Sequence, residues 1–586
     1  MHEDGLEAFL PLPHDDVTPV PTFSATSATP EDQNGTSNLP LKTNRDSDPP
    51  VLDSSPNAFG IFQRYHSLPS SPDTPAHSTT SHTFSDLPEP STSRMLNFDP
   101  YPNETSFLLG EWYWNGGVQK SQKEFMKLIA IISSDSFSPS DICQTNWKLI
   151  NKKLAINDWD NGEWVDEDAG WHRESVSIQV PFNCRMKTPG PQTYTFGKFY
   201  HRSLKAVIVE KLESASSTRY FQNEPYELLW KKEKDGEPLR LYGEMYNSPA
   251  FIDSHRELQN MPREPGCDLP RCVVALMFWS DATHLTASGH TKLWPLYLGF
   301  GNDSKYERCK PTNNLFEHVA YFEKLPDEFK DFAKSFIGDG HQLSKGFLRF
   351  CREEWMHAQW KVLLDEDFMD AYKHGIVIQS LDGIKCRFYP RILTYSADYP
   401  EKVLMASVRQ FGKYPCPRCK TPKAQLHESG TPDDRKRRLE LARVDDERRR
   451  KAVSLAQRFI YDENQSIDSV FVERELFSES LTVASNAFSE RLSEFLNLFN
   501  LFVVDLMHEI EAGTWKDTLV HLLRILASID NNLLHELDKR FRAMPTFGRD
   551  TIRRFSSNAS ELAHLAARDF EDFLQAWGSM MNSVQI

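Results

Sequence analysis

The sequence predicts an α/β fold in which helices flank a mixed sheet. An apolar run of strand-forming residues extends from Cys272 to Trp279, and a second run covers Leu293 to Phe300 after a polar turn. Short apolar runs of this length, bounded by turn residues, are typical of buried strands. A long helical pattern then precedes two further strand-like runs. The predicted order is strand 272–280, strand 292–300, strand 317–323, helical region 327–373, strand 376–381 and strand 386–396.

Residues 1–104 are predicted to form a disordered tail. They are rich in Pro, Ser, Thr, Asp and Asn, with only scattered apolar residues. Such a segment buries too little apolar surface to offset the loss of chain entropy.

Residues 105–240 are predicted to form a separate α+β region. Apolar residues at helical spacing from Phe125 to Ile132 indicate a helix, and Ser138 before Pro139 is typical of a helix start. Alternating runs then predict strands. These runs are VSIQVPF (176–182), TYTFGKFYHRSL (193–204) and KAVIVEKL (205–212).

The core, predicted over residues 241–412, has an acid at the end of two strands. Asp281 directly follows the first strand, and Asp398 lies between strand 386–396 and a predicted helix 401–410. In a ribonuclease-H-like sheet the first and fourth strands are neighbours, so their carboxylates would approach. Like charges so close favour a cation such as Mg²⁺ or Mn²⁺ between them. The alternatives are a turn residue for Asp281 and a helix cap for Asp398.

A cysteine pair opens the predicted insertion, residues 413–485. Cys416 and Cys419 form a CxxC pattern, which is half of a tetrahedral zinc site. His427 is a candidate for a further ligand, with Cys351 and Cys386 as alternatives. Free thiols are the other interpretation.

Two basic clusters follow on a predicted helix. They indicate either a face that contacts DNA phosphates or a nuclear import signal. A solvated helix with internal ion pairs explains them equally well. The clusters consist of Arg435, Lys436, Arg437, Arg438, Arg448, Arg449, Arg450 and Lys451.

The third acid is expected in residues 486–586, a region predicted to be helical from Phe488 to Leu526. On an α-helix Asp505, His508 and Glu509 share a face, while Glu511 lies to one side. Glu511 and Glu509 are the two candidates for a third catalytic acid. Asp505 is a candidate metal ligand or helix cap.

Composition limits the classes of function. A net charge of −16 and a pI near 5.7 mean that any contact with nucleic acid depends on local basic patches. No apolar run approaches the roughly 18–20 residues that a membrane span needs. Nine cysteines, an odd number, do not suggest a disulfide framework. We therefore expect a soluble intracellular protein with no membrane partner.

Six stretches of the chain resemble the Plavaka transposases of fungal, chiefly basidiomycete, genomes, which belong to the Kyakuja–Dileera–Zisupton group of DNA transposons. The resemblance extends from about Phe107 to Gln575. The stretches are WYWNGGVQKSQ, YELLW, FWSDATHLTASGHTKLWPLYLGFGN, PRILTYSADYPEKVLMASVRQFGKYPCPRC, VDLMHEIEAGTWK and PTFGRDTIRRF.

The resemblance implies a ribonuclease-H-like catalytic domain with acidic metal ligands, a cysteine-bearing insertion and cut-and-paste DNA transposition. Asp281 matches the first acid, Asp398 the second, and Glu511 or Glu509 the third. We also expect a nuclear protein that binds transposon ends. The sequence leaves open whether it acts as a monomer or as a homo-oligomer.

The chain departs from the family pattern at both ends. The first hundred residues contain no cysteine, whereas family members often begin with a zinc-finger-like segment. The helical region at the other end is expected to be shortened. A catalytically inactive DNA- or chromatin-binding derivative is therefore the alternative function, and a silent remnant that folds poorly is a third possibility.

Overall fold

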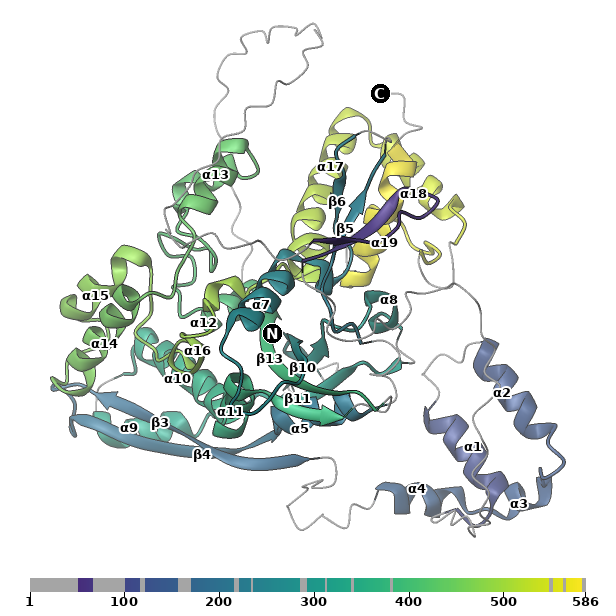
Figure 1. The fold of residues 1–586 in the computed structure, drawn as a ribbon, viewed down its shortest axis with the longest axis horizontal. Coiled ribbons are helices and arrows are strands. Elements are labelled where there is room, and N and C mark those ends of the chain that lie inside the picture. Colours follow the sequence, from purple (N-terminus) through teal and green to yellow (C-terminus); the bar gives the residue numbers. More distant parts are fainter. Residues whose placement is uncertain are drawn as a thin grey trace, which may run out of the picture. The chain divides into compact units, whose positions relative to one another are not determined.

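The computed structural model describes residues 51–66, 101–115, 122–155, 170–214, 221–232, 236–284, 292–310, 313–338, 342–379, 383–546, 552–561 and 565–581 (Figure 1). Most of the predicted tail and part of the PTFGRDTIRRF stretch lie outside the described residues.

The strands of the described chain form three sheets. The strands are β1 Leu52–Asp53, β2 Ile61–Tyr65, β3 Trp171–Phe182, β4 Gly190–Arg202, β5 Glu227–Trp230, β6 Leu239–Leu241, β7 Arg271–Ser280, β8 Thr283–His284, β9 Lys292–Leu293, β10 Pro295–Phe300, β11 Phe316–Tyr321, β12 Ile376–Gln379 and β13 Lys385–Ser396.

Helices occupy most of the remaining described residues. They are α1 Glu104–Asn115, α2 Gln122–Ile132, α3 Pro139–Gln144, α4 Trp147–Ala155, α5 Leu204–Glu213, α7 Pro249–Asn260, α8 Lys305–Arg308, α9 Phe329–Ile337, α10 Lys345–Leu363, α11 Glu366–His374, α12 Tyr399–Met405, α13 Pro432–Glu440, α14 Glu447–Tyr461, α15 Val470–Leu476, α16 Ala487–Leu492, α17 Lys516–Ile529, α18 Asn532–Ala543 and α19 Ala567–Met581. Short 3-10 turns are η1 Met245–Asn247, η3 Lys423–Glu428, η4 Phe477–Glu479 and η5 Leu498–Asn500, and η6 Leu506–Trp515 is a π-helix.

The largest sheet is mixed, as predicted. Its strand order is β12-β13-β7-β10-β11-β4-β3. β7, β10 and β11 form an antiparallel meander, whereas β13 returns parallel to β7 on its other side. The helical segment α9 to α11 separates β11 from the β12–β13 hairpin, and this agrees with the predicted order.

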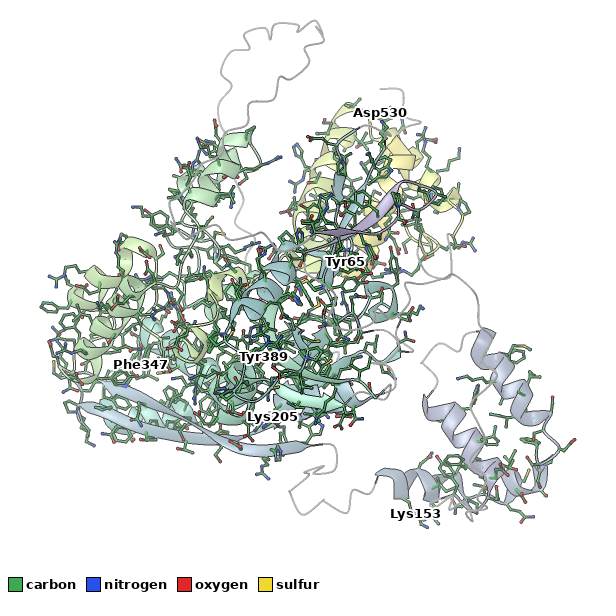
Figure 2. The ribbon with its side chains drawn as sticks, viewed as in Figure 1. Tyr65, Lys153, Lys205, Phe347, Tyr389 and Asp530 are labelled. Atoms are coloured by element: carbon green, nitrogen blue, oxygen red, sulfur yellow. The ribbon has the colours of Figure 1, made fainter. Side chains whose placement is uncertain are left out.

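Helices cover both faces of this sheet. Successive side chains of β7 point to opposite faces, so both faces carry apolar residues that the helices bury. Val274 and Phe278 belong to the large core that includes α10, where Phe278 packs edge-on against Trp360 at 5.3 Å. Val273 and Ala275 belong to a smaller core with Phe251 of α7. Figure 2 shows the side chains that fill these layers, with Phe347 of α10 and Tyr389 of β13 labelled.

Asn302 joins β7 to the end of β10 from a fully buried position. Its side-chain amide donates to the carbonyls of Val273 and Gln222, each at 2.8 Å, and its oxygen accepts from the backbone N–H of Ala275 at 2.8 Å. The asparagine therefore satisfies two backbone groups of β7 on the side where pairing with β10 has ended, and the carbonyl of Gln222 as a third.

We expect Asn302→Ala to lower the free energy of unfolding by about 2–3 kcal/mol, because it leaves buried backbone groups without partners. Urea unfolding followed by tryptophan fluorescence measures the change. Asn260→Ala, at the exposed last residue of α7, is the control and should have little effect. Equal stabilities of the Asn302 variant and the wild type would contradict the role given to this side chain.

Three predictions about local structure differ from the structure. The run KAVIVEKL forms helix α5 and not a strand, because Ser203 caps it by accepting from Ala206 N and its apolar residues share one buried face. Strands β1 and β2 lie within the predicted tail; β2 pairs with β5, and Phe62 is buried. Strands β3 and β4, predicted to belong to a separate region, extend the main sheet.

The segment from Phe488 to Leu526 is not one helical region. α16 and η5 end before a short extended stretch, in which Phe502 forms a parallel bridge to Tyr395 of β13. Backbone hydrogen bonds link Tyr395 N to Leu501 O and Val503 N to Tyr395 O. The π-helix η6 begins only after this stretch.

Within the described residues, each helix is too short or too polar to cross a membrane.

Candidate active site

Asp281 and Asp398 lie at the same end of two adjacent parallel strands. In the β7–β13 register Trp279 is opposite Ser396. Asp281 lies two residues after Trp279, and Asp398 lies two residues after Ser396. Neighbouring strands are about 4.8 Å apart, so the topology brings the two predicted acids together. Both side chains are partly exposed.

Asp398 is also the N-cap of α12. Its Oδ1 accepts from the backbone N–H of Glu401 at 2.8 Å. The capping interpretation of this residue is therefore correct, and it is compatible with a place in the site. The cap fixes the carboxylate relative to β13 and occupies one of its two oxygens.

Asp505 reaches the same end of the sheet from the extended stretch beside β13. It caps η6, where Oδ1 accepts from His508 N at 3.1 Å and Oδ2 lies 2.8 Å from His508 Nδ1. The side chain is buried.

His508 links Asp505 to Asp281. Its Nε2 lies 4.0 Å from Asp281 Oδ2. Partial burial lowers the pKa of the imidazole. The hydrogen bond to Asp505 and the negative charges of Asp505, Asp281 and Asp398 outweigh that effect, so the pKa is raised overall. All three aspartates therefore act on one imidazole.

Within the described residues, neither Glu509 nor Glu511, the sequence candidates for the third acid, forms a hydrogen bond or ion pair with His508. Glu509 forms an ion pair with the nearly buried Lys402 of α12. Burial raises the pKa of Glu511, and the charges of Glu571 and Asp505 add to the increase while Arg568 opposes it. Glu511 and Asp505 line the same pocket beside α19. The sequence-based comparison of faces assumed α-helical spacing, whereas these residues lie in a π-helix with a wider turn. A catalytic role for Glu509 or Glu511 stays a prediction.

Glu401 is a buried carboxyl group that sequence reasoning missed. Its Oε1 accepts from the hydroxyls of Ser280 and Tyr395, and its Oε2 accepts from Trp294 Nε1 at 3.0 Å. Burial raises its pKa to about 8, against the hydrogen bonds, and the charge of Asp398 adds to the increase.

The sequence pattern around Glu401 predicts a different role for this residue. An Asp at the N-cap with a Glu three residues later predicts a capping box, in which the Glu turns back to the helix start. Here the side chain turns inward because the buried hydroxyls of Ser280 and Tyr395, near the ends of β7 and β13, and the partly buried indole N–H of Trp294 before β10 all donate to it. Glu401 therefore joins the strand end that carries Asp281 to the one that carries Asp398.

The metal expected from the sequence has suitable donors, because carboxylates from strand ends are the ligands that Mg²⁺ and Mn²⁺ prefer. In the part of the chain that the structure describes, no three Asp, Glu, His or Cys side chains lie close enough to hold one ion together. The imidazole of His508 bridges Asp281 and Asp505 in this arrangement.

The cysteine pair is folded as a tight turn. Cys416 and Cys419 share a hydrogen bond, which lowers the pKa of Cys419 to about 5 and raises that of Cys416. His427 is exposed and contacts Ala424 O and Glu428. Within the described residues no third ligand joins the two sulfurs, so a complete zinc site stays a prediction.

The basic clusters lie on two helices, α13 and α14, and not on one. Arg449 is buried against Asp445 and Ser489 and is not accessible to a phosphate. Most of the other cations form ion pairs: Arg437 with Glu428, Arg438 with Asp434, Arg450 with Asp445, Lys451 with Glu447 and Lys436 with Glu440. Arg435, Lys436 and Arg448 are exposed.

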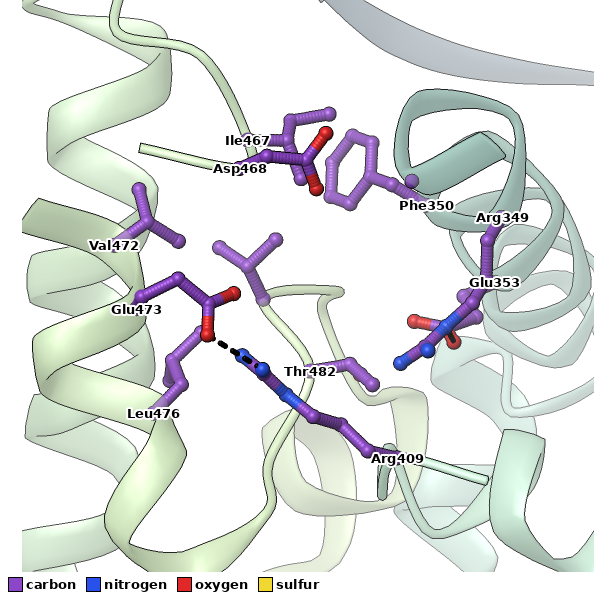
Figure 3. Close-up of a pocket in the computed structure, with 12 residues that line it drawn as sticks. Arg349, Phe350, Glu353, Arg409, Ile467, Asp468, Val472, Glu473, Leu476 and Thr482 are labelled. Carbon is purple, nitrogen blue, oxygen red and sulfur yellow. Dashed lines mark hydrogen bonds and ion pairs between the residues drawn. The ribbon is translucent and has the colours of Figure 1, made fainter. Parts of the chain in front are cut away.

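A second pocket, between α10 and α15, is occupied by internal ion pairs. Figure 3 shows Arg409 bound to Glu473, with Arg349 beside Glu353 across the cavity. Burial raises the pKa of Glu353, while Arg349 opposes that increase. The polar residues of this pocket therefore have a structural role, because the Arg409–Glu473 ion pair attaches α15 to the core.

The sequence was compared with protein families and with curated proteins. None of the curated proteins matches the chain. The family model described as Plavaka transposase matches residues 162–523, which is more than half of the chain. The matched region contains Asp281, Asp398 and Asp505. The chain therefore belongs to the Plavaka transposase family.

Proposed function

We propose that this protein cleaves and joins DNA strands in cut-and-paste transposition, using Asp281, Asp398 and Asp505 as its acids. The observation that carries the proposal is the meeting of these residues, from three separate segments, around His508. The family relationship supports DNA as the substrate.

We further propose that the sheet is ribonuclease-H-like. The antiparallel meander β7-β10-β11 and the parallel addition of β13 beside β7 support this assignment. The stretch around Phe502, which bridges β13 in parallel, takes the place of a fifth strand. Ligand sites in such α/β sheets lie beyond the carboxyl ends of the parallel strands, where all three acids are.

Asp281 and Asp398 are the residues that would hold Mg²⁺ or Mn²⁺, with Asp505 as the third carboxylate. When bound, such ions supply Lewis-acid activation and charge neutralisation for attack on a phosphodiester. His508 holds a proton at Nε2 facing Asp281 while its Nδ1 binds Asp505, and thereby reduces repulsion among the acids. The Lys402–Glu509 ion pair joins α12 to η6, the two helices that Asp398 and Asp505 cap.

Nicking and joining assays test the proposal. The purified full chain is incubated with duplex DNA that carries the terminal repeats flanking its gene, with Mg²⁺ or Mn²⁺ and with a chelator as control. We expect metal-dependent strand cleavage and joining. Salt-sensitive DNA binding without cleavage would instead favour the non-catalytic derivative, and would overturn the proposed chemistry.

The exposed cations of α13 and α14 are expected to add affinity without sequence preference. Replacing Arg435, Lys436 and Arg448 with Ala should lower the slope of log affinity against log salt by about two to three, because each phosphate contact contributes about 0.9. Fluorescence anisotropy over a salt series measures the slope. Ala at Lys330 and Lys334 of α9, which pair with neighbouring aspartates, is the control. An unchanged slope in the α13–α14 variant would remove these residues from the interface.

A further inference from the structure

An apolar pocket of about 380 Å³ lies beside the two segments that carry Asp398 and Asp505. It is formed by α12, by the loop that leads into the cysteine turn, and by the extended stretch beside β13. Tyr399 directly follows Asp398, and Val504 directly precedes Asp505, so the pocket adjoins both acids. The residues that line it include Tyr399, Phe411, Pro417, Leu426, Phe502 and Val504.

Phe411 at the edge of this pocket is not explained by packing. Its side chain is 65% exposed, although it is a large aromatic ring. Its backbone has a φ of 53°, in the left-handed region that bulky residues rarely adopt. Strained backbone of this kind is concentrated at active sites and ligand-binding sites. The N–H of Phe411 donates to the Tyr399 hydroxyl at 3.3 Å, and the two rings lie 5.5 Å apart.

The rim of the pocket is positively charged. Arg418 and Lys423 are exposed there, and within the described residues neither forms an ion pair with a carboxylate. The negative charge of Glu509 is paired with Lys402. The pocket therefore suits a ligand that has a flat apolar face and a negative charge at its edge. A nucleotide within a DNA strand has both properties.

We propose that this pocket receives one unstacked base of the DNA strand next to the bond that is cleaved. Phe411 and Tyr399 stack against the base, while Arg418 and Lys423 contact the flanking phosphates. The proposal rests on the proposed function, since it requires DNA at the acids. It adds a binding site for a single base that the acids themselves do not provide.

Affinity measurements with three duplexes test the proposal. The duplexes differ at one position near the strand end, which carries a paired base, an unpaired base or an abasic site, and this position is moved along the DNA in a series. Binding is measured without divalent ions, so that cleavage plays no part. We expect the wild type to bind the unpaired base about tenfold or more tightly than the abasic site at one position.

Variants of Phe411 identify the pocket as the source of this preference. Phe411→Ala should bind the unpaired base and the abasic site equally, while Phe411→Trp should keep the preference. Tyr306→Ala is the matched control, because Tyr306 is an aromatic residue of similar exposure (69%) on α8. Arg418→Ala and Lys423→Ala should weaken binding to all three duplexes alike.

Phe411→Gly separates the role of the ring from an effect on folding. Glycine adopts a positive φ without strain, so this variant should unfold at no lower temperature than the wild type. It should nevertheless lose the preference for the unpaired base. A preference retained in both the Gly and Ala variants would overturn the proposal.

The binding and cleavage assays together distinguish failure of the base-binding pocket from failure of the proposed catalytic function. Equal binding of unpaired and abasic duplexes by the wild type, together with metal-dependent cleavage, would overturn the pocket alone. A clear preference for the unpaired base without cleavage would support the pocket and overturn the proposed catalysis. Absence of DNA binding would overturn both.

Discussion

Asp281→Asn is expected to lower the rate of metal-dependent DNA strand cleavage by about a thousandfold or more, because an amide cannot replace the charge of a metal-binding carboxylate. Asp398→Asn should have a similar effect on cleavage. Asn still accepts the capping hydrogen bond from Glu401 N, so α12 is expected to form. DNA binding should remain in both variants, since the carboxylates repel phosphates in the absence of metal.

Variants of the candidate third acids distinguish Asp505 from Glu511 and Glu509. Asp505→Asn should lose cleavage to the same extent as Asp281→Asn. Glu511→Gln should retain most activity, because the strongest charge effects on Glu511 come from Glu571 and Arg568 of α19 and not from His508. Glu509→Gln is expected to have an intermediate effect, since it weakens the contact with Lys402 that joins α12 to η6.

Single-turnover cleavage of labelled duplex DNA, at saturating Mg²⁺ or Mn²⁺, measures these differences. Circular dichroism and thermal unfolding of each variant show whether the fold is intact. Full activity of Asp281→Asn would remove this residue from the mechanism. Activity lost in Glu511→Gln but kept in Asp505→Asn would assign the third role to Glu511, one of the two residues that the sequence suggested for it.

The stability of the protein is expected to fall as pH rises from about 4.5 to about 8 because of Glu401. Its pKa is raised from 4.5 to about 8, mainly by burial. The folded state therefore holds the proton more tightly than the unfolded state. The contribution is fully present below pH 4.5 and is lost as pH rises through 8, at up to about 1.4 kcal/mol per pH unit. The total is on the order of 3–5 kcal/mol.

Glu401→Gln should remove this part of the pH dependence. Glutamine is neutral at every pH and can serve the same three partners, with its NH₂ directed to the hydroxyls of Ser280 and Tyr395 and its oxygen to Trp294. The variant should be close to the wild type in stability at pH 5 and more stable at pH 8. Because the Glu401 carboxyl joins the two strand ends that carry Asp281 and Asp398, the variant should cleave DNA more slowly than the wild type.

Urea unfolding of wild type and variant at pH 5, 6.5 and 8 tests the second prediction. The quantity compared is the difference between the two free energies of unfolding at each pH, so that other titrating groups cancel. Glu447→Gln, at an exposed position of α14, is the control and should leave the pH dependence unchanged. A wild type–variant difference that stays constant from pH 5 to pH 8 would contradict the assignment.

Much of the core could be predicted from its sequence because strand signals are local. The apolar runs that become β7 and β13 are bounded by polar residues at the ends that carry Asp281 and Asp398. Periodicity failed at α5, where Val and Ile favoured a strand but a Ser203 cap and a buried helical face decided the structure. It also failed for β2, a short strand that is stabilised by its pairing with β5.

The positions of the side chains in the site depend more on contacts between distant segments than on local sequence pattern. Whether Glu509 or Glu511 faces the acids is set by the start of η6, which depends on where the preceding stretch pairs with Tyr395 of β13. Glu401 occurs in a pattern that predicts a cap, yet Ser280, Tyr395 and Trp294 draw it into the core. None of these partners is close to it in the chain, apart from Tyr395.

By itself, the sequence determined the family, the order of the core strands and the two acids at their ends. Those features follow from local pattern, because hydrophobic period and turn residues are written in consecutive positions. Only the tertiary structure decided that Asp505, a candidate metal ligand or helix cap in the sequence, is linked to Asp281 by His508, and that Phe411 borders a pocket near the segments that carry these acids. Each of these depends on the distance between segments far apart in the chain, and side-chain direction in an irregular or π-helical stretch is not encoded in residue spacing.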